Sequence, residues 1–136
     1  MTNYERVRSW MQSVDQETPE SFQAMDSPTK RLRIDLIREE YKELMWELSA
    51  ATPDYSKVAK EATDVLVVVY GLFSAMGVDA DKAMAITCDN NDAKVSHRRV
   101  ADNGKIVVPP EVKKQLKQQA EDAMSKLVSA QPEVAK

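Results

Sequence analysis

The sequence is poor in glycine, cysteine and histidine, and each shortage excludes a class of site. Three glycines in 136 residues are too few for the glycine-rich turns that hold phosphates in P-loop and dinucleotide-binding proteins. The single cysteine, Cys88, permits no intrachain disulfide and is typical of a reducing compartment. The single histidine, His97, has no glutamate three residues before it, which argues against a di-iron bundle built on Glu-x-x-His pairs.

Charge and hydropathy exclude two classes of partner. The formal net charge is −3, from 19 basic and 22 acidic residues, whereas nucleic-acid binding needs a net basic surface. The longest apolar stretch, Val65–Phe73 with Gly71 inside it, is too short to cross a bilayer. The N-terminus is charged and lacks the apolar segment of a signal peptide. We therefore expect a soluble, cytoplasmic protein with neither a nucleic-acid nor a membrane partner.

Helical periodicity predicts an all-α, four-helix-bundle-like fold with an additional C-terminal helix. The length fits one domain over residues 1–128, followed by a loose tail over 129–136. Ser27 is the predicted N-cap of the second helix, and Gly77 is the predicted left-handed stop of the third. A turn at 102–105 precedes a short extended piece at 106–108. The predicted helices are Tyr4–Val14, Ser27–Ala50, Ser56–Met76, Asp79–Arg98 and Glu111–Val128.

The third predicted helix is apolar on every side around Val65–Phe73. Such a helix has to be covered on all sides, and one small bundle offers too few neighbours to do so. We therefore expect a subunit interface along this helix and a homodimer or homotetramer.

Two acidic pairs are the candidate metal ligands. Glu40 and Glu43 stand three residues apart on the second predicted helix, and Glu61 and Asp64 do so on the third. Residues at this spacing project from one face, and a short loop makes the two helices antiparallel neighbours. Carboxylates beside apolar residues lose hydration and repel one another. A divalent cation relieves both costs, and oxygen ligands favour Mg²⁺, with Mn²⁺ as a substitute.

Three other interpretations of these features stay open. Glutamates three apart are common on solvated helix surfaces, so each pair alone carries little weight. The apolar third helix and the amphipathic C-terminal helix also fit a non-catalytic oligomerisation module. A protein that binds nucleotides as a sensor, with slow turnover, is a third possibility.

The carboxylate pattern resembles a known signature. Glu40-x-x-Glu43, a gap of 17 residues and Glu61-x-x-Asp64 are similar to the motif of the all-α NTP pyrophosphohydrolase superfamily, which includes MazG, dimeric dUTPases and phosphoribosyl-ATP pyrophosphohydrolases. Glu39 completes the Glu-Glu-x-x-Glu run of that motif. Asn91-Asp92-Ala93-Lys94 resembles its Asn-x-x-Lys, and the Gly104-Lys105 turn is similar to one in the stand-alone MazG-like subgroup.

The resemblance implies hydrolysis of a (d)NTP to the (d)NMP and diphosphate, through attack of water on the α-phosphorus. It assigns Glu39 as the general base, and Asn91 and Lys94 as ligands of the substrate's ribose and phosphates. Arg33 is a candidate for the terminal phosphates or for a salt bridge to a neighbouring acid. Trp10 is a candidate for stacking on the base or for the ordinary core.

One departure bears on the substrate. Phosphoribosyl-ATP enzymes carry Lys-x-Gly ahead of the Glu-Glu pair, where this chain has Leu36-Ile37-Arg38. Dimeric dUTPases are usually longer than this chain. The resemblance therefore favours a stand-alone (d)NTP hydrolase that acts on the nucleotide pool.

The second tryptophan, Trp46, is expected to pack in the core or at an interface.

Overall fold

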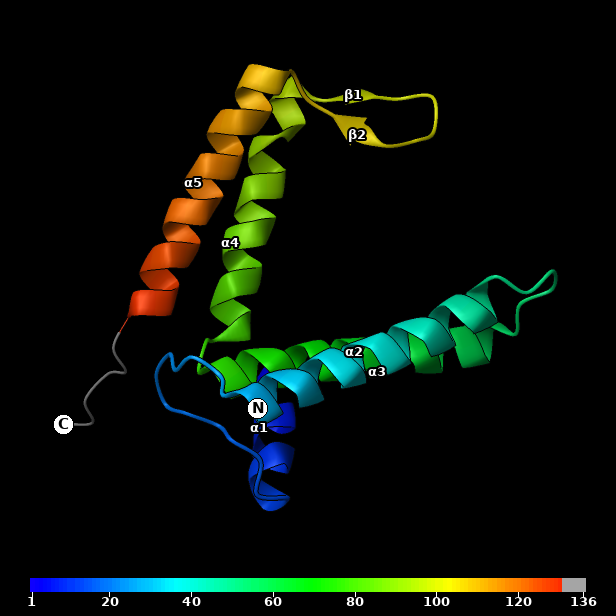
Figure 1. The fold of residues 1–136 in the computed structure, drawn as a ribbon. Helices are drawn as coiled ribbons and strands as arrows, with labels where there is room; N and C mark the ends of the chain where they lie inside the picture. Colours follow the sequence, from blue (N-terminus) through cyan, green and yellow to red (C-terminus); the bar gives the residue numbers. More distant parts are fainter. Residues whose placement is uncertain (131–136) are drawn as a thin grey trace. The chain divides into compact units, whose positions relative to one another are not determined.

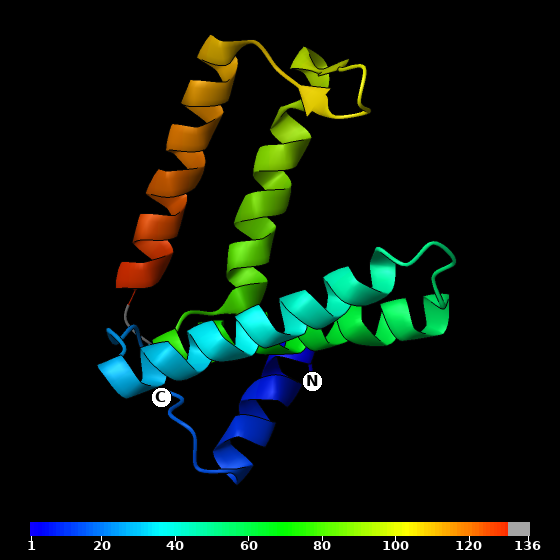
Figure 2. The ribbon, with the colours of Figure 1, turned by 45° about the vertical axis from the view of Figure 1, so that its right-hand side comes forward.

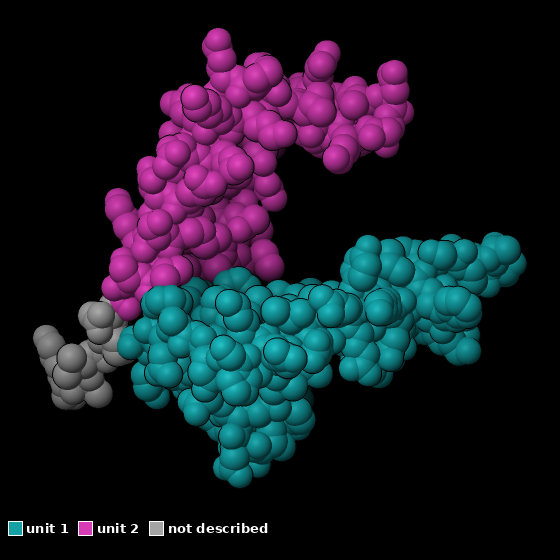
Figure 3. Space-filling model, viewed as in Figure 1, with its two compact units in different colours: residues 1–80 teal, residues 81–136 magenta. Residues whose placement is uncertain are grey.

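The computed structural model describes residues 1–130, and the predicted tail falls largely outside that range, at residues 131–136. The described chain forms two compact units, which divide between Ala80 and Asp81 (Figure 3). Five α-helices, one 3₁₀ turn and one two-stranded hairpin make up its regular structure (Figure 1). The all-α fold class is thus confirmed, and the single domain over 1–128 stays a prediction.

The first unit is built on a helical hairpin. Helices α2 (Ser27–Leu48) and α3 (Tyr55–Met76) run side by side in Figures 1 and 2, joined by a short loop, and are therefore antiparallel. Helix α2 begins one residue earlier than predicted, because the Asp26 carboxylate, rather than Ser27, accepts a hydrogen bond from the Thr29 amide at 2.8 Å. Helix α3 ends as predicted at Gly77, whose φ is 71°.

Helix α1 (Asn3–Ser13) packs on α3 and closes the small core of the first unit. Thr2 and Glu5 form a capping box that fixes its start. Tyr4 and Met11 are buried beneath it, and the Tyr4 ring lies 6.3 Å from that of Tyr70. A hydrogen bond of 3.0 Å from the Gln23 amide to the Met76 carbonyl connects the loop after α1 to the end of α3.

The second unit contains nearly all of α4 (Ala80–Ala93), which begins at the last residue of the first unit. It also contains the 3₁₀ turn η1 (Val95–His97), strands β1 (Arg99–Val100) and β2 (Ile106–Val107), and α5 (Pro110–Ser129). The prediction of one continuous helix to Arg98 is wrong. The amide of Lys94 bonds the Asn91 carbonyl at 3.1 Å, and this three-residue spacing tightens the chain into a 3₁₀ turn. The extended piece at 106–108 is the second strand of a hairpin whose first strand was not predicted.

Within residues 1–130, no single helix is both long enough and apolar enough to cross a membrane.

Candidate metal centre

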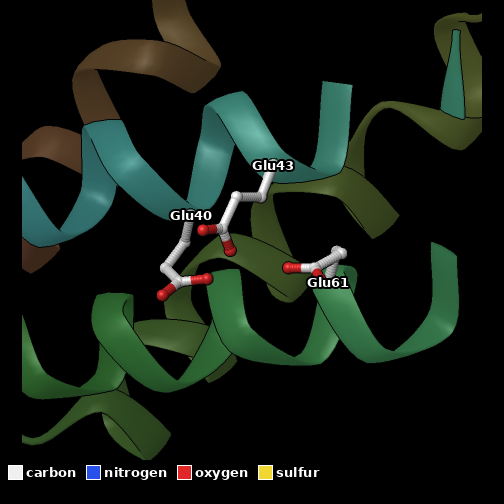
Figure 4. Close-up of side chains that lie close together, drawn as sticks. All are labelled: Glu40, Glu43 and Glu61. Atoms are coloured by element: carbon white, nitrogen blue, oxygen red, sulfur yellow. The ribbon is translucent and has the colours of Figure 1, made fainter. Parts of the chain in front are cut away.

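Three carboxylates meet between α2 and α3. Figure 4 shows Glu40 and Glu43 on α2 and Glu61 on α3, with their carboxyl groups turned toward one another. One oxygen of each lies within 4.8 Å of the others. The spacing of three residues places Glu40 and Glu43 on one face of α2, and the antiparallel hairpin brings Glu61 opposite that face. The predicted convergence of the two helices is therefore present for three of the four proposed ligands.

The carboxylates of the cluster are partly buried and close enough to repel one another. One oxygen of Glu40 and one of Glu61 are buried and have no hydrogen-bond partner. Burial raises the pKa of the Glu61 carboxyl, and a hydrogen bond that its protonated form donates to Glu43, together with repulsion by Glu43 and Asp64, raises it further. A hydrogen bond between two carboxyl groups requires a proton on one of them. Full ionisation of the cluster would leave three carboxylates in mutual repulsion, which a proton or a divalent cation would relieve.

Asp64, the fourth predicted ligand, faces a lysine. Its two oxygens accept from the Lys60 ammonium at 2.7 and 2.6 Å, and it is not one of the three clustered carboxylates. Lys60 stands four residues earlier on α3, the spacing at which helix side chains pair. Hydrogen bonding to Asp64 raises the pKa of Lys60, whose charge also lies close to Glu61 and Glu40. Lys60 therefore supplies part of the positive charge that the cluster requires.

The donor set fits a hard divalent cation. Carboxylate oxygens are the ligands that Mg²⁺ and Mn²⁺ accept, whereas zinc favours nitrogen and sulfur. The buried oxygens of Glu40 and Glu61 would gain a partner from such an ion. Asp64 is one turn of α3 from Glu61 and can join them if it releases Lys60.

Glu39 and Arg33 occupy different settings on α2. Glu39 is exposed and does not belong to the three-carboxylate cluster. Arg33 is 4% exposed, and its guanidinium donates to the Gln16 side chain at 2.6 Å. This hydrogen bond of Arg33 goes to the neutral amide of Gln16 and not to an acid, unlike the salt bridge that was one of its two predicted roles. The base role of Glu39 and the phosphate role of Arg33 stay predictions.

Trp10 lines a cavity on the other side of α3. This cavity of about 520 Å³ lies between α1 and α3, and Leu66, Val67 and Tyr70 help to line it. Tyr70 follows Glu61 by nine residues, which is two and a half helical turns, so the two side chains point to opposite sides of α3. Trp10 is 56% exposed and is not a core residue. Its role in base binding stays a prediction.

Asn91 and Lys94 belong to the second unit. Asn91 is an exposed residue of α4, and Lys94 is half-buried directly after that helix. Their backbones are linked by the hydrogen bond that begins the 3₁₀ turn. Their roles toward ribose and phosphate also stay predictions.

Two residues beside the cluster were not predicted as site residues. Lys60 pairs with Asp64, and the spacing of four residues was a signal for it. Trp46 lines a cavity of about 300 Å³ together with Glu43 and Glu61. It follows Glu43 by three residues, the same spacing that identified the acidic pairs.

Comparison with known proteins identifies the family. Residues 5–91 match the family described as phosphoribosyl-ATP pyrophosphohydrolase. This match covers more than half of the chain, including all four predicted metal ligands, and the chain belongs to that family. No curated protein is significantly similar to it.

Proposed function

We propose that this member of the phosphoribosyl-ATP pyrophosphohydrolase family hydrolyses a nucleoside or deoxynucleoside triphosphate to the monophosphate and diphosphate with Mg²⁺ as cofactor. Family membership gives the coarser statement, a pyrophosphohydrolase that acts on nucleotides. The observation that carries the proposal is the cluster of Glu40, Glu43 and Glu61, two of whose oxygens are buried without a partner.

The proposed reaction places the triphosphate against this cluster. When bound there, a divalent ion supplies charge neutralisation for phosphate oxygens and acidifies water. Glu39 is proposed to accept the proton of the water that attacks the α-phosphorus. Lys94 and Asn91 are proposed to contact phosphate and ribose, and Arg33 the terminal phosphates. The P–O bond between the α-phosphorus and the bridging oxygen breaks, and diphosphate leaves.

A second candidate substrate is phosphoribosyl-ATP itself. The description of the matching family favours it, and the bond cleaved would again join the α- and β-phosphates. The segment Leu36-Ile37-Arg38, where the enzymes of that specificity carry Lys-x-Gly, favours the simpler triphosphates.

A turnover panel tests the proposal. The protein is incubated with each of the eight common NTPs and dNTPs and with phosphoribosyl-ATP, with Mg²⁺ or with EDTA, in ¹⁸O-labelled water. We expect Mg²⁺-dependent release of diphosphate, with the ¹⁸O label in the monophosphate. Glu43→Gln should abolish release. If diphosphate is released from no nucleotide, or the label enters orthophosphate, the proposed reaction is wrong and a binding or oligomerisation role takes its place.

We also propose that the protein is a homodimer or homotetramer. Leu66 and Val67 on α3 are 55% and 40% exposed, and Trp10 beside them is 56% exposed. An apolar patch of this kind is typical of a protein interface. Light scattering coupled to size exclusion should give at least twice the 15.3 kDa chain mass. A monomer at micromolar concentration would refute this proposal.

A further inference from the structure

Trp46 stands in an unusual position for a tryptophan. It is 79% exposed near the end of α2, although tryptophan is mostly buried in folded proteins. Its side chain lines two cavities. One, of about 300 Å³, includes Glu43 and Glu61 of the carboxylate cluster. The other, of about 640 Å³, includes Tyr41 and Met45.

The position of Trp46 follows from its spacing to the cluster. Side chains three residues apart on a helix are neighbours, with Cβ atoms about 5–6 Å from each other. Trp46 therefore lies beside Glu43 and on the side toward the end of α2. A nucleotide whose phosphates contact the carboxylate cluster extends its ribose and base away from the α-phosphate, and the indole is the aromatic surface that borders the same cavity.

We propose that Trp46 is a specificity-determining residue on which the base of the nucleotide stacks, and that it makes this site select nucleotides over inorganic polyphosphates. The inference rests on the proposed function. Stacking on an indole requires only an aromatic face, so it tolerates any base. Lys42, which lines both cavities with Trp46, adds a cation at the rim of a site otherwise rich in carboxylates.

The other tryptophan is the natural comparison. Trp10 and Trp46 are the two tryptophans of the chain, and both are exposed. Trp10 borders the cavity between α1 and α3, whose α3 residues include Leu66, Val67 and Tyr70. That face of α3 is turned away from Glu61. A base stacked on Trp46 therefore lies in a cavity that Glu43 and Glu61 also line, whereas one stacked on Trp10 lies in a cavity without cluster residues.

The test compares a ligand with a base to one without. For the wild type and three variants, we measure the KM of the triphosphate that the wild type hydrolyses fastest. We also measure the Ki of inorganic tripolyphosphate as a competitive inhibitor. The ratio of Ki to KM reports the contribution of the base. In Trp46→Ala this ratio should fall about 5- to 140-fold, the range expected for one base–aromatic stack. Trp46→Phe should keep most of the ratio, and Trp10→Ala tests the alternative position for the base that the sequence predicted.

Several results would overturn the inference while the proposed function stands. One is an unchanged ratio in Trp46→Ala. Another is an equal loss of affinity for both ligands, accompanied by a change of mass in light scattering, which would assign Trp46 to a subunit interface. A loss of the ratio in Trp10→Ala alone would move the base to the other cavity. Absence of nucleotide hydrolysis by the wild type would refute the proposed function, and the inference with it.

A second measurement covers the case in which Trp46→Ala does not fold. In Trp10→Phe, Trp46 is the remaining tryptophan, so its fluorescence reports on this site alone. The same nucleotide, with Ca²⁺ in place of Mg²⁺, should quench that fluorescence, and tripolyphosphate with Ca²⁺ should not. Equal quenching by both ligands, or by neither, would contradict the inference.

Discussion

Gly71→Ala should destabilise the protein, although alanine is the better helix former. Gly71 lies inside α3 and is buried. A Cβ atom at this position would lie 2.5 Å from the Arg33 guanidinium, which is too close for any atom pair that is not bonded. The side chain of Arg33 must therefore move, and it is buried and hydrogen-bonded to Gln16 at 2.6 Å.

Two opposing terms set the magnitude. Replacing an interior helix glycine by alanine contributes about 1 kcal/mol of stability through helix propensity. Losing a hydrogen bond from a charged group costs about 1.5–3 kcal/mol. Arg33 is a buried cation whose pKa is lowered by desolvation, so it tolerates the loss poorly. The net destabilisation is about 0.5–2 kcal/mol, which corresponds to a fall in Tm of roughly 2–8 °C.

A double-mutant cycle separates the two terms. Thermal and urea unfolding are measured for Gly71→Ala, Arg33→Ala and the double variant. In the Arg33→Ala background the collision is absent, and Gly71→Ala should raise stability by about 1 kcal/mol. The reasoning is refuted if Gly71→Ala stabilises the wild type, or if its effect is the same in both backgrounds.

Three further predictions concern charge. The folded pKa of Glu61 is raised above 4.5, so its contribution to stability is present below pH 4.5 and lost as pH rises through the folded pKa. The Tm of the cation-free protein, relative to Glu61→Gln, should therefore fall between acid and neutral pH, and a flat difference would contradict the shift. Lys60→Gln frees Asp64 from its ion pair and should tighten Mn²⁺ binding by no more than about fivefold, because exposed ion pairs are weak. Lys57→Gln is the matched control. Weaker Mn²⁺ binding in Lys60→Gln alone would overturn this expectation. The Asp26 carboxylate accepts hydrogen bonds from Thr29, which lower its pKa. Asp26→Ala should therefore lower the Tm above about pH 4, and progressively less in acid. An equal loss of Tm at all pH values would assign the effect to something other than the carboxylate.

The sequence predicted the number of α-helices and most of their ends because these signals are local, whereas the end of α4 was placed too late. Helix α2 begins at Ser27 and ends at Leu48, α3 begins at Tyr55, and each of these ends lies within two residues of its prediction from Pro28 and Thr52-Pro53, while Gly77 ends α3 as predicted. The predicted N-cap of α2, Ser27, is one residue away from the observed N-cap, Asp26, and both are good capping side chains. The hairpin at 99–107 was half missed because each of its strands has two residues, which is too short for an alternating pattern to appear.

The candidate site was predictable to the extent that it depends on helix geometry. Spacing identified Glu40, Glu43 and Glu61, since three-residue pairs on antiparallel neighbours converge. The spacing could not show that Asp64 pairs with Lys60. Asp64 can form either an ion pair within α3 or a contact with the carboxylates on α2, and the sequence does not say which of the two is preferred. The same limit applies to Trp46, whose exposure depends on how little of the chain covers the end of α2.

Arg33 shows a different limit. A charged residue on a helix is expected to face solvent or a ligand, and here it is buried against Gly71. The small residue that permits this lies on another helix and is distant in sequence, so only the packing of α2 against α3 reveals the pair.

The central claim is that Glu40, Glu43 and Glu61 together bind a divalent cation, and Mn²⁺ binding followed by electron paramagnetic resonance tests it directly. At neutral pH the wild type should bind Mn²⁺, Mg²⁺ should displace it, and Glu61→Gln should bind it at least tenfold more weakly. If the wild type leaves Mn²⁺ free in solution, or if Glu61→Gln binds it equally well, the three carboxylates are not a metal centre.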